Sequence, residues 1–163
     1  MRYHNITKDD MLNGDGLRVV LWLAGCSHAC KGCQNPITWD PQGGILFDQA
    51  AREEIFAQLD QSYISGITFS GGDPLFRGNE KEVTEFVKEL KEKYPRKTIW
   101  LYTGYTWEVI QDKEITDYLD VVVDGKFIEE EKDVSLKWRG SPNQRVIDVP
   151  KTKKEGRVIL HAE

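Results

Sequence analysis

The sequence has little of what nucleic-acid-binding and membrane-spanning proteins usually carry. Its 22 basic residues are outnumbered by 27 acidic ones, which gives a net charge of −5. Proteins that bind nucleic acids or anionic membranes generally carry a basic surface, so neither partner is expected. No apolar run approaches the roughly 20 residues that a membrane crossing requires. The most apolar stretch, residues 19–24, has the length of a buried strand.

Two further absences bear on location and size. The N-terminus does not show the basic, apolar and small-residue order of a secretory signal, which predicts a cytoplasmic location where thiols stay reduced. With 163 residues, the chain is too short for an eight-stranded βα barrel of about 250 residues. No linker or low-complexity segment interrupts it, so we expect one domain spanning residues 1–163.

Strand-like and helix-like segments alternate along most of the chain. Apolar, β-rich segments predict strands over residues 17–24, 64–69, 98–103 and 120–124. Helices are expected after three capping residues, namely Asp48, Asn79 (with Glu82 as its capping partner) and Thr106. Toward the C-terminus we expect strands over residues 145–149 and 157–161, joined by a solvated turn or linker at 151–155.

This order of elements predicts an α/β fold with a mostly parallel open sheet and outer helices. In such sheets, ligands bind beyond the carboxyl ends of the strands. Three chemically unusual segments follow predicted strands: residues 25–35, 70–74 and 103–105. We therefore expect these segments to converge at one edge of the sheet.

The cysteines are three in number and lie in one short run, Cys26-Ser27-His28-Ala29-Cys30-Lys31-Gly32-Cys33. An odd number excludes complete pairing as disulfides, and one compact loop with this spacing can wrap three thiolates around one metal centre. A 4Fe-4S cluster would keep one iron without a protein thiolate, open to a substrate or cofactor. The alternatives are a structural Cys3His zinc site, with His28 or a distant histidine as fourth ligand, and three unrelated buried cysteines. The cluster is favoured because His28, between two cysteines, would be cramped on the same ion.

A glycine-rich turn, Ser70-Gly71-Gly72-Asp73-Pro74, ends the second predicted strand. Paired glycines let the backbone come close to a ligand, whose ammonium or carboxylate the exposed N–H and C=O groups could bind. Asp73 could support the loop or help hold an ammonium. Taken alone, this pattern is more often an ordinary turn between a strand and a loop.

Together, Cys-x3-Cys-x2-Cys after one strand and Gly-Gly-Asp-Pro after the next resemble the radical S-adenosylmethionine superfamily. The resemblance implies a partial (βα)6-type barrel, with Cys26, Cys30 and Cys33 holding a 4Fe-4S cluster. It also implies S-adenosylmethionine at the open iron, where one electron releases a 5′-deoxyadenosyl radical that abstracts a hydrogen atom. No general acid or base is required, so no catalytic side chain is expected.

Nearly the whole chain is similar to one family within that superfamily, the anaerobic ribonucleoside-triphosphate reductase-activating proteins. The matching segments are residues 13–16, 32–35, 70–75, 100–105, 123–127 and 138–145. This resemblance implies that the chain installs a glycyl radical on a partner reductase, with a reduced flavodoxin-like protein as electron donor. It remains open whether the chain activates another glycyl-radical enzyme of the formate-lyase type, rearranges a small molecule, or is a non-catalytic, zinc-stabilised interaction module.

The resemblance assigns roles to individual residues. Contacts to S-adenosylmethionine are expected from Gly32, Gln34, Gly71, Gly72, Asp73 and Tyr102. Gly32 stands where the superfamily often has an aromatic residue, and Gln34 where close relatives often have tyrosine. Adenine packing is therefore expected partly from Tyr102 or Tyr105.

Five other polar residues have two interpretations each. Thr103 and Asp124 lie at predicted strand ends, where they either line the pocket or belong to the core or a turn. Arg139, Asn143 and Gln144 lie in a segment with few core signals, where they either dock the partner or hold a loop.

Overall fold

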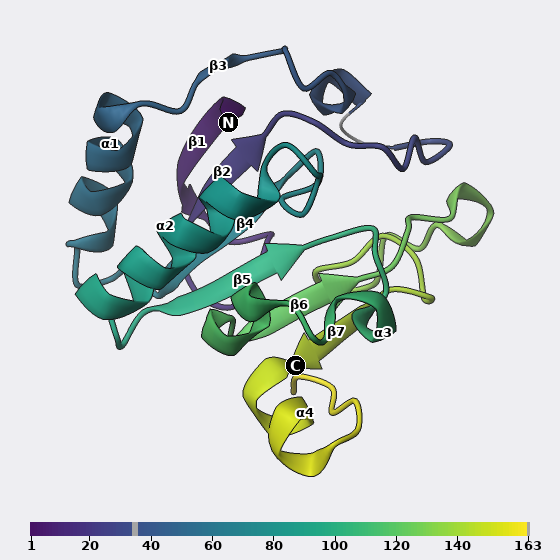
Figure 1. Cartoon of the computed structure of the whole chain (residues 1–163). Coiled ribbons are helices and arrows are strands. Elements are labelled where there is room, and N and C mark those ends of the chain that lie inside the picture. Colours follow the sequence, from purple (N-terminus) through teal and green to yellow (C-terminus); the bar gives the residue numbers. More distant parts are fainter. Residues whose placement is uncertain (34–35, 163) are drawn as a thin grey trace.

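The chain forms a mixed α/β structure around one sheet, seen in a computed structural model that describes residues 1–33 and 36–162 (Figure 1). Within these residues the sheet has seven strands in the order β3-β1-β2-β4-β5-β6-β7. The strands are β1 (Arg2–Asp10), β2 (Arg18–Leu23), β3 (Ile45–Leu46), β4 (Gly66–Gly71), β5 (Thr98–Tyr102), β6 (Val121–Asp124) and β7 (Arg145–Asp148). The α-helices are α1 (Gln49–Leu59), α2 (Glu80–Lys93), α3 (Trp107–Ile110) and α4 (Val149–Glu155). Short 3-10 helices are η1 (Pro36–Trp39), η2 (Glu114–Tyr118) and η3 (Glu129–Glu131).

The four central strands β2, β4, β5 and β6 are parallel. Helical segments connect them: α1 precedes β4, α2 joins β4 to β5, and α3 with η2 joins β5 to β6. The outer strands are antiparallel, since β1 pairs with β2 and β3, and β7 pairs with β6. The α/β class and the open sheet with a parallel centre are confirmed. A partial barrel of six βα units is not supported. In the described residues, β1, β3 and β7 join the sheet as antiparallel strands and not through helical crossovers.

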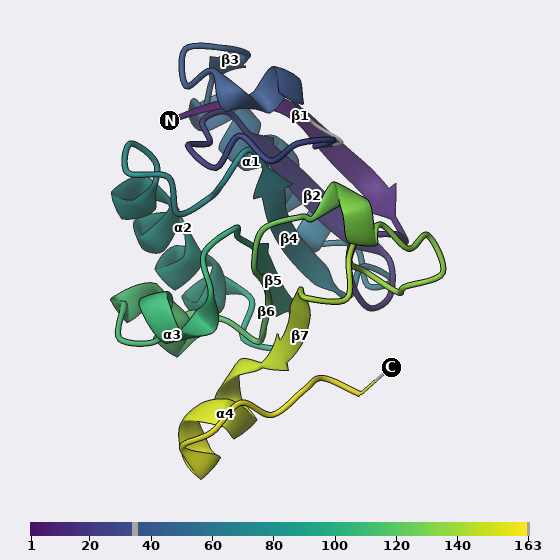
Figure 2. The same cartoon turned by 90° about the vertical axis from the view of Figure 1, so that its right-hand side faces the viewer.

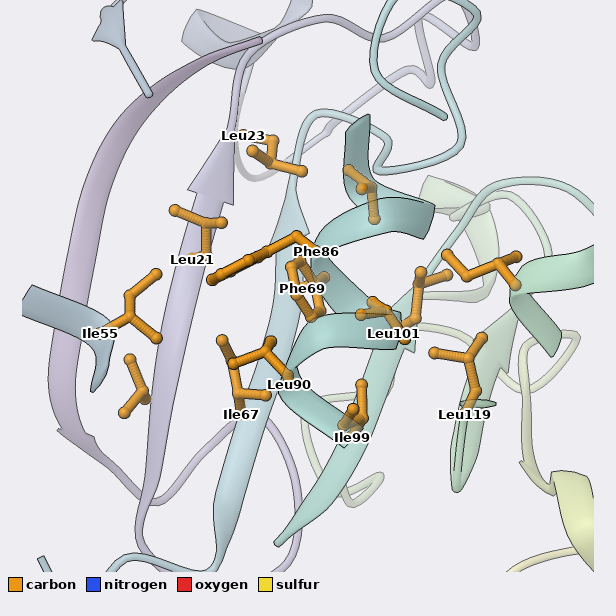
Figure 3. Close-up of a cluster of buried hydrophobic side chains, with 14 of the residues drawn as sticks. Leu21, Leu23, Ile55, Ile67, Phe69, Phe86, Leu90, Ile99, Leu101 and Leu119 are labelled. Atoms are coloured by element: carbon orange, nitrogen blue, oxygen red, sulfur yellow. The ribbon is translucent and has the colours of Figure 1, made fainter. Parts of the chain in front are cut away.

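The sheet has one apolar face and one aromatic and polar face, and the alternation within each strand creates both. On β5, Ile99 and Leu101 belong to the large core cluster beneath α1 and α2, together with Phe86 of α2 (Figure 3). Trp100 and Tyr102 alternate with them and belong to a second cluster with Val121, Val123, Trp138 and Val146. Figure 2 shows α2 and α3 on one side of the sheet and the connection from β6 to β7 on the other.

Arg18 is a fully buried charge on the second face, at the start of β2. Its guanidinium donates to the Thr68 and Thr98 hydroxyls and to the carbonyls of Asp15, Ile67 and Thr98. It also lies over the Trp100 ring, 5.4 Å from the ring centroid. Burial lowers the Arg18 pKa to about 10, against the opposing effect of nearby acidic groups led by Asp120. The side chain thus fills the amino-terminal end of this face and joins β2, β4 and β5 there.

The three predicted helix starts are correct in position, but two of the capping residues, Asn79 and Thr106, make no side-chain capping bond. Asp48 caps α1, because its carboxylate accepts from the Ala51 amide at 3.0 Å. Asn79 is the N-cap residue of α2 but makes no side-chain capping bond, so the predicted capping pair with Glu82 is wrong. The Asn79 amide instead donates to the Ala24 carbonyl at 2.7 Å and ties the start of α2 to the end of β2.

The C-terminal predictions are wrong in two places. Residues 151–155 are helical as part of α4 rather than a solvated linker, because Asp148 caps the helix and Pro150 lies in its first turn, where it is tolerated. Residues 157–161 do not form a strand, and Leu160 makes an isolated bridge with Ile147 of β7.

The buried guanidinium supports a stability prediction. Arg18→Lys keeps the charge, but one ammonium cannot reach acceptors on both β4 and β5, so several buried oxygens lose their donor. We expect a loss of about 3 kcal/mol in the free energy of unfolding, measured by urea denaturation. The same change at the exposed Arg157 should stay within about 0.5 kcal/mol of the parent. Equal stabilities of the two variants would contradict the assigned role.

Candidate functional site

The cysteine loop follows β2 and folds back over the end of that strand. The Gly25 amide donates to the Thr38 carbonyl at 2.6 Å, and the Cys26 amide donates to the Trp39 carbonyl at 3.2 Å. These bonds fix the loop to η1. Cys26, Cys30 and Cys33 are all half-buried, and all three line one cavity of about 150 Å³.

The opposite wall of this cavity comes from the ends of the next three parallel strands. Its residues belong to three segments: Ser70 to Asp73 at the end of β4, Tyr102 to Gly104 at the end of β5, and Gly125 to Phe127 after β6. Figure 1 shows the loops after β2 and β4 at the same end of the sheet. The predicted convergence of the three unusual segments is therefore confirmed, because parallel strands bring their carboxyl ends to one edge.

The two glycines of the turn after β4 allow the turn to lie directly against the cysteine loop. A Cβ on Gly71, whose φ is +102°, would approach the Leu23 amide nitrogen to 2.4 Å. A Cβ on Gly72 would approach the Gly25 carbonyl oxygen to 2.4 Å. The backbone of the turn bonds to the same segment, with the Gly72 amide donating to Leu23 and the Asp73 amide donating to Gly25. Any larger residue here would separate the two halves of the cavity.

Asp73 is buried, and its carboxylate is hydrogen-bonded to other residues of the chain. Its Oδ2 accepts from the His28 ring at 2.6 Å, the Thr103 hydroxyl at 2.9 Å and the Gly104 amide at 2.9 Å. Its Oδ1 accepts from the Leu75 amide at 2.9 Å. Two roles were predicted for this carboxylate, supporting the loop or helping to hold an ammonium. These hydrogen bonds correspond to the first.

Burial raises the pKa of the Cys26 thiol, and the nearby Asp73 charge acts in the same direction. The backbone amides of His28 and Ala29 hydrogen-bond to the sulfur and oppose this effect. The same amides would stabilise a Cys26 thiolate once a metal replaces the proton, so metal loading would release a proton at this residue.

The two candidate adenine-packing tyrosines lie in different places. Tyr102 lines the cysteine cavity, and its hydroxyl donates to the Trp138 carbonyl at 2.6 Å. Burial raises the Tyr102 pKa, so this hydroxyl keeps its proton. Tyr105 packs edge-on against His28, with ring centroids 4.6 Å apart, and lines a neighbouring cavity.

The other predicted residues divide between the cavity and its support. Thr103 lines the cavity, whereas Asp124 is buried and bonded to Arg145 and to the Trp107 amide. Arg139, Asn143 and Gln144 hold the segment between β6 and β7 together through bonds to its carbonyls. Gly32 lies in the cysteine loop with φ +72°, and Gln34 lies outside the described residues.

A second cavity, of about 580 Å³, continues from the first. The two share six lining residues, namely Cys30, Cys33, Ser70, Tyr102, Phe127 and Gln144. Its other walls combine apolar side chains, among them Trp22, Leu136 and Trp138, with the polar Asp10, Asn13 and Arg139. The combined space offers room for an organic ligand beside the cysteines.

Trp39 is a wall residue that the sequence reasoning missed. It lines the cysteine cavity, and its buried Nε1 finds no acceptor in the part of the chain that the structure describes. A buried donor without an acceptor is costly, so this indole stands out among the residues that line the cavity. The sequence signal that could have identified Trp39 is a tryptophan that closely follows the last cysteine.

The cavity fits an iron–sulfur cluster and its ligand in the chemistry of its donors. Three soft sulfur ligands come from one loop, and the glycines of the turn after β4 line the same cavity. The described residues do not already gather three potential metal ligands around one point. His28, the proposed fourth zinc ligand, instead donates from Nε2 to Asp73.

Comparison with known proteins identifies the family. The model of a 4Fe-4S single cluster domain matches residues 12–147. The anaerobic ribonucleoside-triphosphate reductase-activating protein of Enterobacteria phage T4 is 45% identical, over 90% of this chain and 93% of that protein. The proteins of the same name from Haemophilus influenzae and Escherichia coli K12 are 43% and 39% identical, over 88% and 90% of this chain and 96% and 97% of their own length.

The chain belongs to the anaerobic ribonucleoside-triphosphate reductase-activating protein family. Membership of this 4Fe-4S family favours the cluster over the zinc interpretation of the cysteine loop. Among the described residues of this family member, no helix is long and apolar enough to cross a membrane.

The tight contact at Gly72 gives a prediction with a matched control. Gly72→Ala pushes a methyl group against the Gly25 and Thr38 carbonyls, so the turn has to move away from the cysteine loop. We expect it to lower stability by about 1–3 kcal/mol and to reduce the iron retained after anaerobic reconstitution. Gly78→Ala, at an exposed glycine whose Cβ would meet the nearest atom at 3.4 Å, should change neither quantity.

Thermal unfolding and iron content of both variants provide the measurement. Wild-type iron content in Gly72→Ala would contradict the contact between the turn and the loop.

Proposed function

We propose that the chain is a radical S-adenosylmethionine enzyme that activates an anaerobic ribonucleoside-triphosphate reductase. One observation carries the proposal: in a member of this family, three thiols of one loop and a Gly-Gly-Asp turn line one cavity that opens into a larger one. Cys26, Cys30 and Cys33 would hold a 4Fe-4S cluster and leave one iron to bind the cofactor.

The bound groups would supply the redox chemistry. When bound, the cluster would supply one electron for the reductive cleavage of S-adenosylmethionine to methionine and 5′-deoxyadenosine, the latter carrying the hydrogen atom taken from a glycine of the reductase. The protein's own residues would then bind the cofactor, orient it toward the glycine and exclude water from the site.

The walls of the two cavities divide this binding between them. The backbone of Ser70, Gly71 and Gly72 faces the cysteines and presents polar groups to the methionine end of the cofactor. Tyr102 and Phe127 line both cavities and provide apolar surface for the nucleoside. Gly32 and Gln34 flank Cys33 in sequence and remain proposed contacts.

The larger cavity provides space for the substrate. A glycine on a loop of the reductase would enter beside Trp22 and Leu136 and approach the radical carbon at the shared wall. A reduced flavodoxin-like protein would supply the electron, and a cytoplasmic location would keep the thiols reduced. These functions are proposed for a single domain spanning residues 1–163.

Anaerobic reconstitution with iron and sulfide, followed by reduction in the presence of S-adenosylmethionine, tests the proposal. We expect methionine and 5′-deoxyadenosine in equal amounts, and a glycyl radical signal in electron paramagnetic resonance when the reductase is added. A formate-lyase type partner in a parallel sample should give no such signal. A colourless protein that binds one zinc and releases neither product would contradict the proposal.

The cysteine ligands have a separate test. Cys30→Ala removes a thiolate from the loop, so the cluster should be lost and cofactor cleavage should fall by at least about a thousandfold. The fold should persist, because Cys30 lies outside the two apolar clusters that form the core. An unchanged rate of 5′-deoxyadenosine formation would show that Cys30 is not a ligand.

A further inference from the structure

His28 lies between Cys26 and Cys30 in the sequence, yet its side chain is held by the opposite wall of the cavity. The imidazole is only 6% exposed, and its Nε2 lies 2.6 Å from Asp73 Oδ2. A carboxylate is an acceptor only, so Nε2 carries the proton and donates. This bond is the shortest of the four that the described residues make to the Asp73 carboxylate.

The Oδ2 oxygen of Asp73 is already fully used within the described residues. It receives His28, Thr103 and Gly104, whereas Oδ1 receives Leu75. Each carboxylate oxygen offers about two lone-pair positions, so the three donors exceed what Oδ2 provides. An ammonium group of a ligand could bond to Oδ2 only by displacing one of them, and the carboxylate as a whole is only 2% exposed.

The imidazole is also held by its shape. Its ring lies edge-on to Tyr105 at 4.6 Å between centroids. On another side lies Gly104, where a Cβ would come within 2.5 Å of His28 Cδ2. The absence of a side chain at Gly104 thus leaves the space that the ring fills, and the ring has one position in which it both packs and donates.

We propose that His28 and Asp73 form a clasp, meaning the hydrogen-bonded pair that fixes the cysteine loop to the turns after β4 and β5. Both are positioning residues. The part of the proposal that concerns S-adenosylmethionine rests on the proposed function: Asp73 supports the site and does not accept from the cofactor's ammonium, a contact that falls to the backbone of Ser70, Gly71 and Gly72.

The first test compares two substitutions of His28 in the full chain. His28→Phe keeps the ring contact with Tyr105 but removes the donor, and His28→Gln keeps an N–H donor near the same place. We expect a ferrous chelator to remove iron from reconstituted His28→Phe about tenfold to a hundredfold faster than from the parent. His28→Gln should restore the rate to within a few-fold.

The matched control is a second histidine–aspartate pair, His161 and Asp15, whose facing atoms lie 3.1 Å apart at the amino-terminal end of β5. His161→Phe should leave the rate of iron loss unchanged. Equal rates in His28→Phe and the parent, or no rescue by His28→Gln, would overturn the clasp. Amide hydrogen exchange of the metal-free protein provides a further readout, since residues 26–33 should exchange about tenfold faster in His28→Phe.

The second test asks what Asp73 binds. The affinity for S-adenosylmethionine is measured for His28→Phe, Asp73→Asn and the double variant. If the pair acts as a clasp, the double variant is no worse than Asp73→Asn alone, because both changes remove the same bond. Asp73→Asn itself can lose more than His28→Phe, since Thr103, Gly104 and Leu75 also donate to that carboxylate. If Asp73 binds the ammonium independently of His28, the two single losses add in the double variant, which would overturn the assignment.

The two proposals fail in different ways. A parent protein that does not bind S-adenosylmethionine would contradict the proposed function. The hydrogen-exchange comparison in the metal-free protein would still decide the clasp.

Discussion

The carboxylate of Asp73 is the interaction on which the rest of the site depends. It is buried, so its charge is tolerable only with donors around it, and those donors come from the cysteine loop, from its own turn and from the end of β5. Three segments distant in sequence are thereby held at one edge of the sheet. The glycines beside it make the contact close enough for thiols and backbone to line one cavity.

The two faces of the sheet differ, and this difference determines where space for the site remains. The helix-covered face carries the apolar residues that supply most of the hydrophobic stabilisation, whereas the other face is aromatic and polar. Arg18, Trp100 and Trp138 fill the second face toward its amino-terminal end. The remaining space lies where the parallel strands end, between the cysteine loop and the segment that joins β6 to β7.

Sequence reasoning predicted the parts of this arrangement that depend on local chemistry. Three features can be recognised locally in the sequence. They are the cysteine spacing, the turns that end the strands, and the apolar periodicity, which is helical in α2 and alternating in β5. What it missed depends on tertiary context. β1 is an outer strand with charged and polar residues and few apolar ones, so it has no clear alternation. The amide of Asn79 is used by a carbonyl 55 residues away rather than by its own helix. Residues 151–155 became helical because a capping aspartate and a first-turn proline outweighed their charge.

We propose that three cysteines leave one iron open for S-adenosylmethionine in a cavity that glycine backbone also lines. Electron–nuclear double resonance on the reduced cluster tests it most directly, using cofactor labelled with ¹⁵N at the methionine amino group and ¹⁷O at the carboxylate. We expect hyperfine coupling from both labels, because both groups would bind the same iron. A reduced cluster that shows coupling from neither label, with the cofactor in excess, would contradict it.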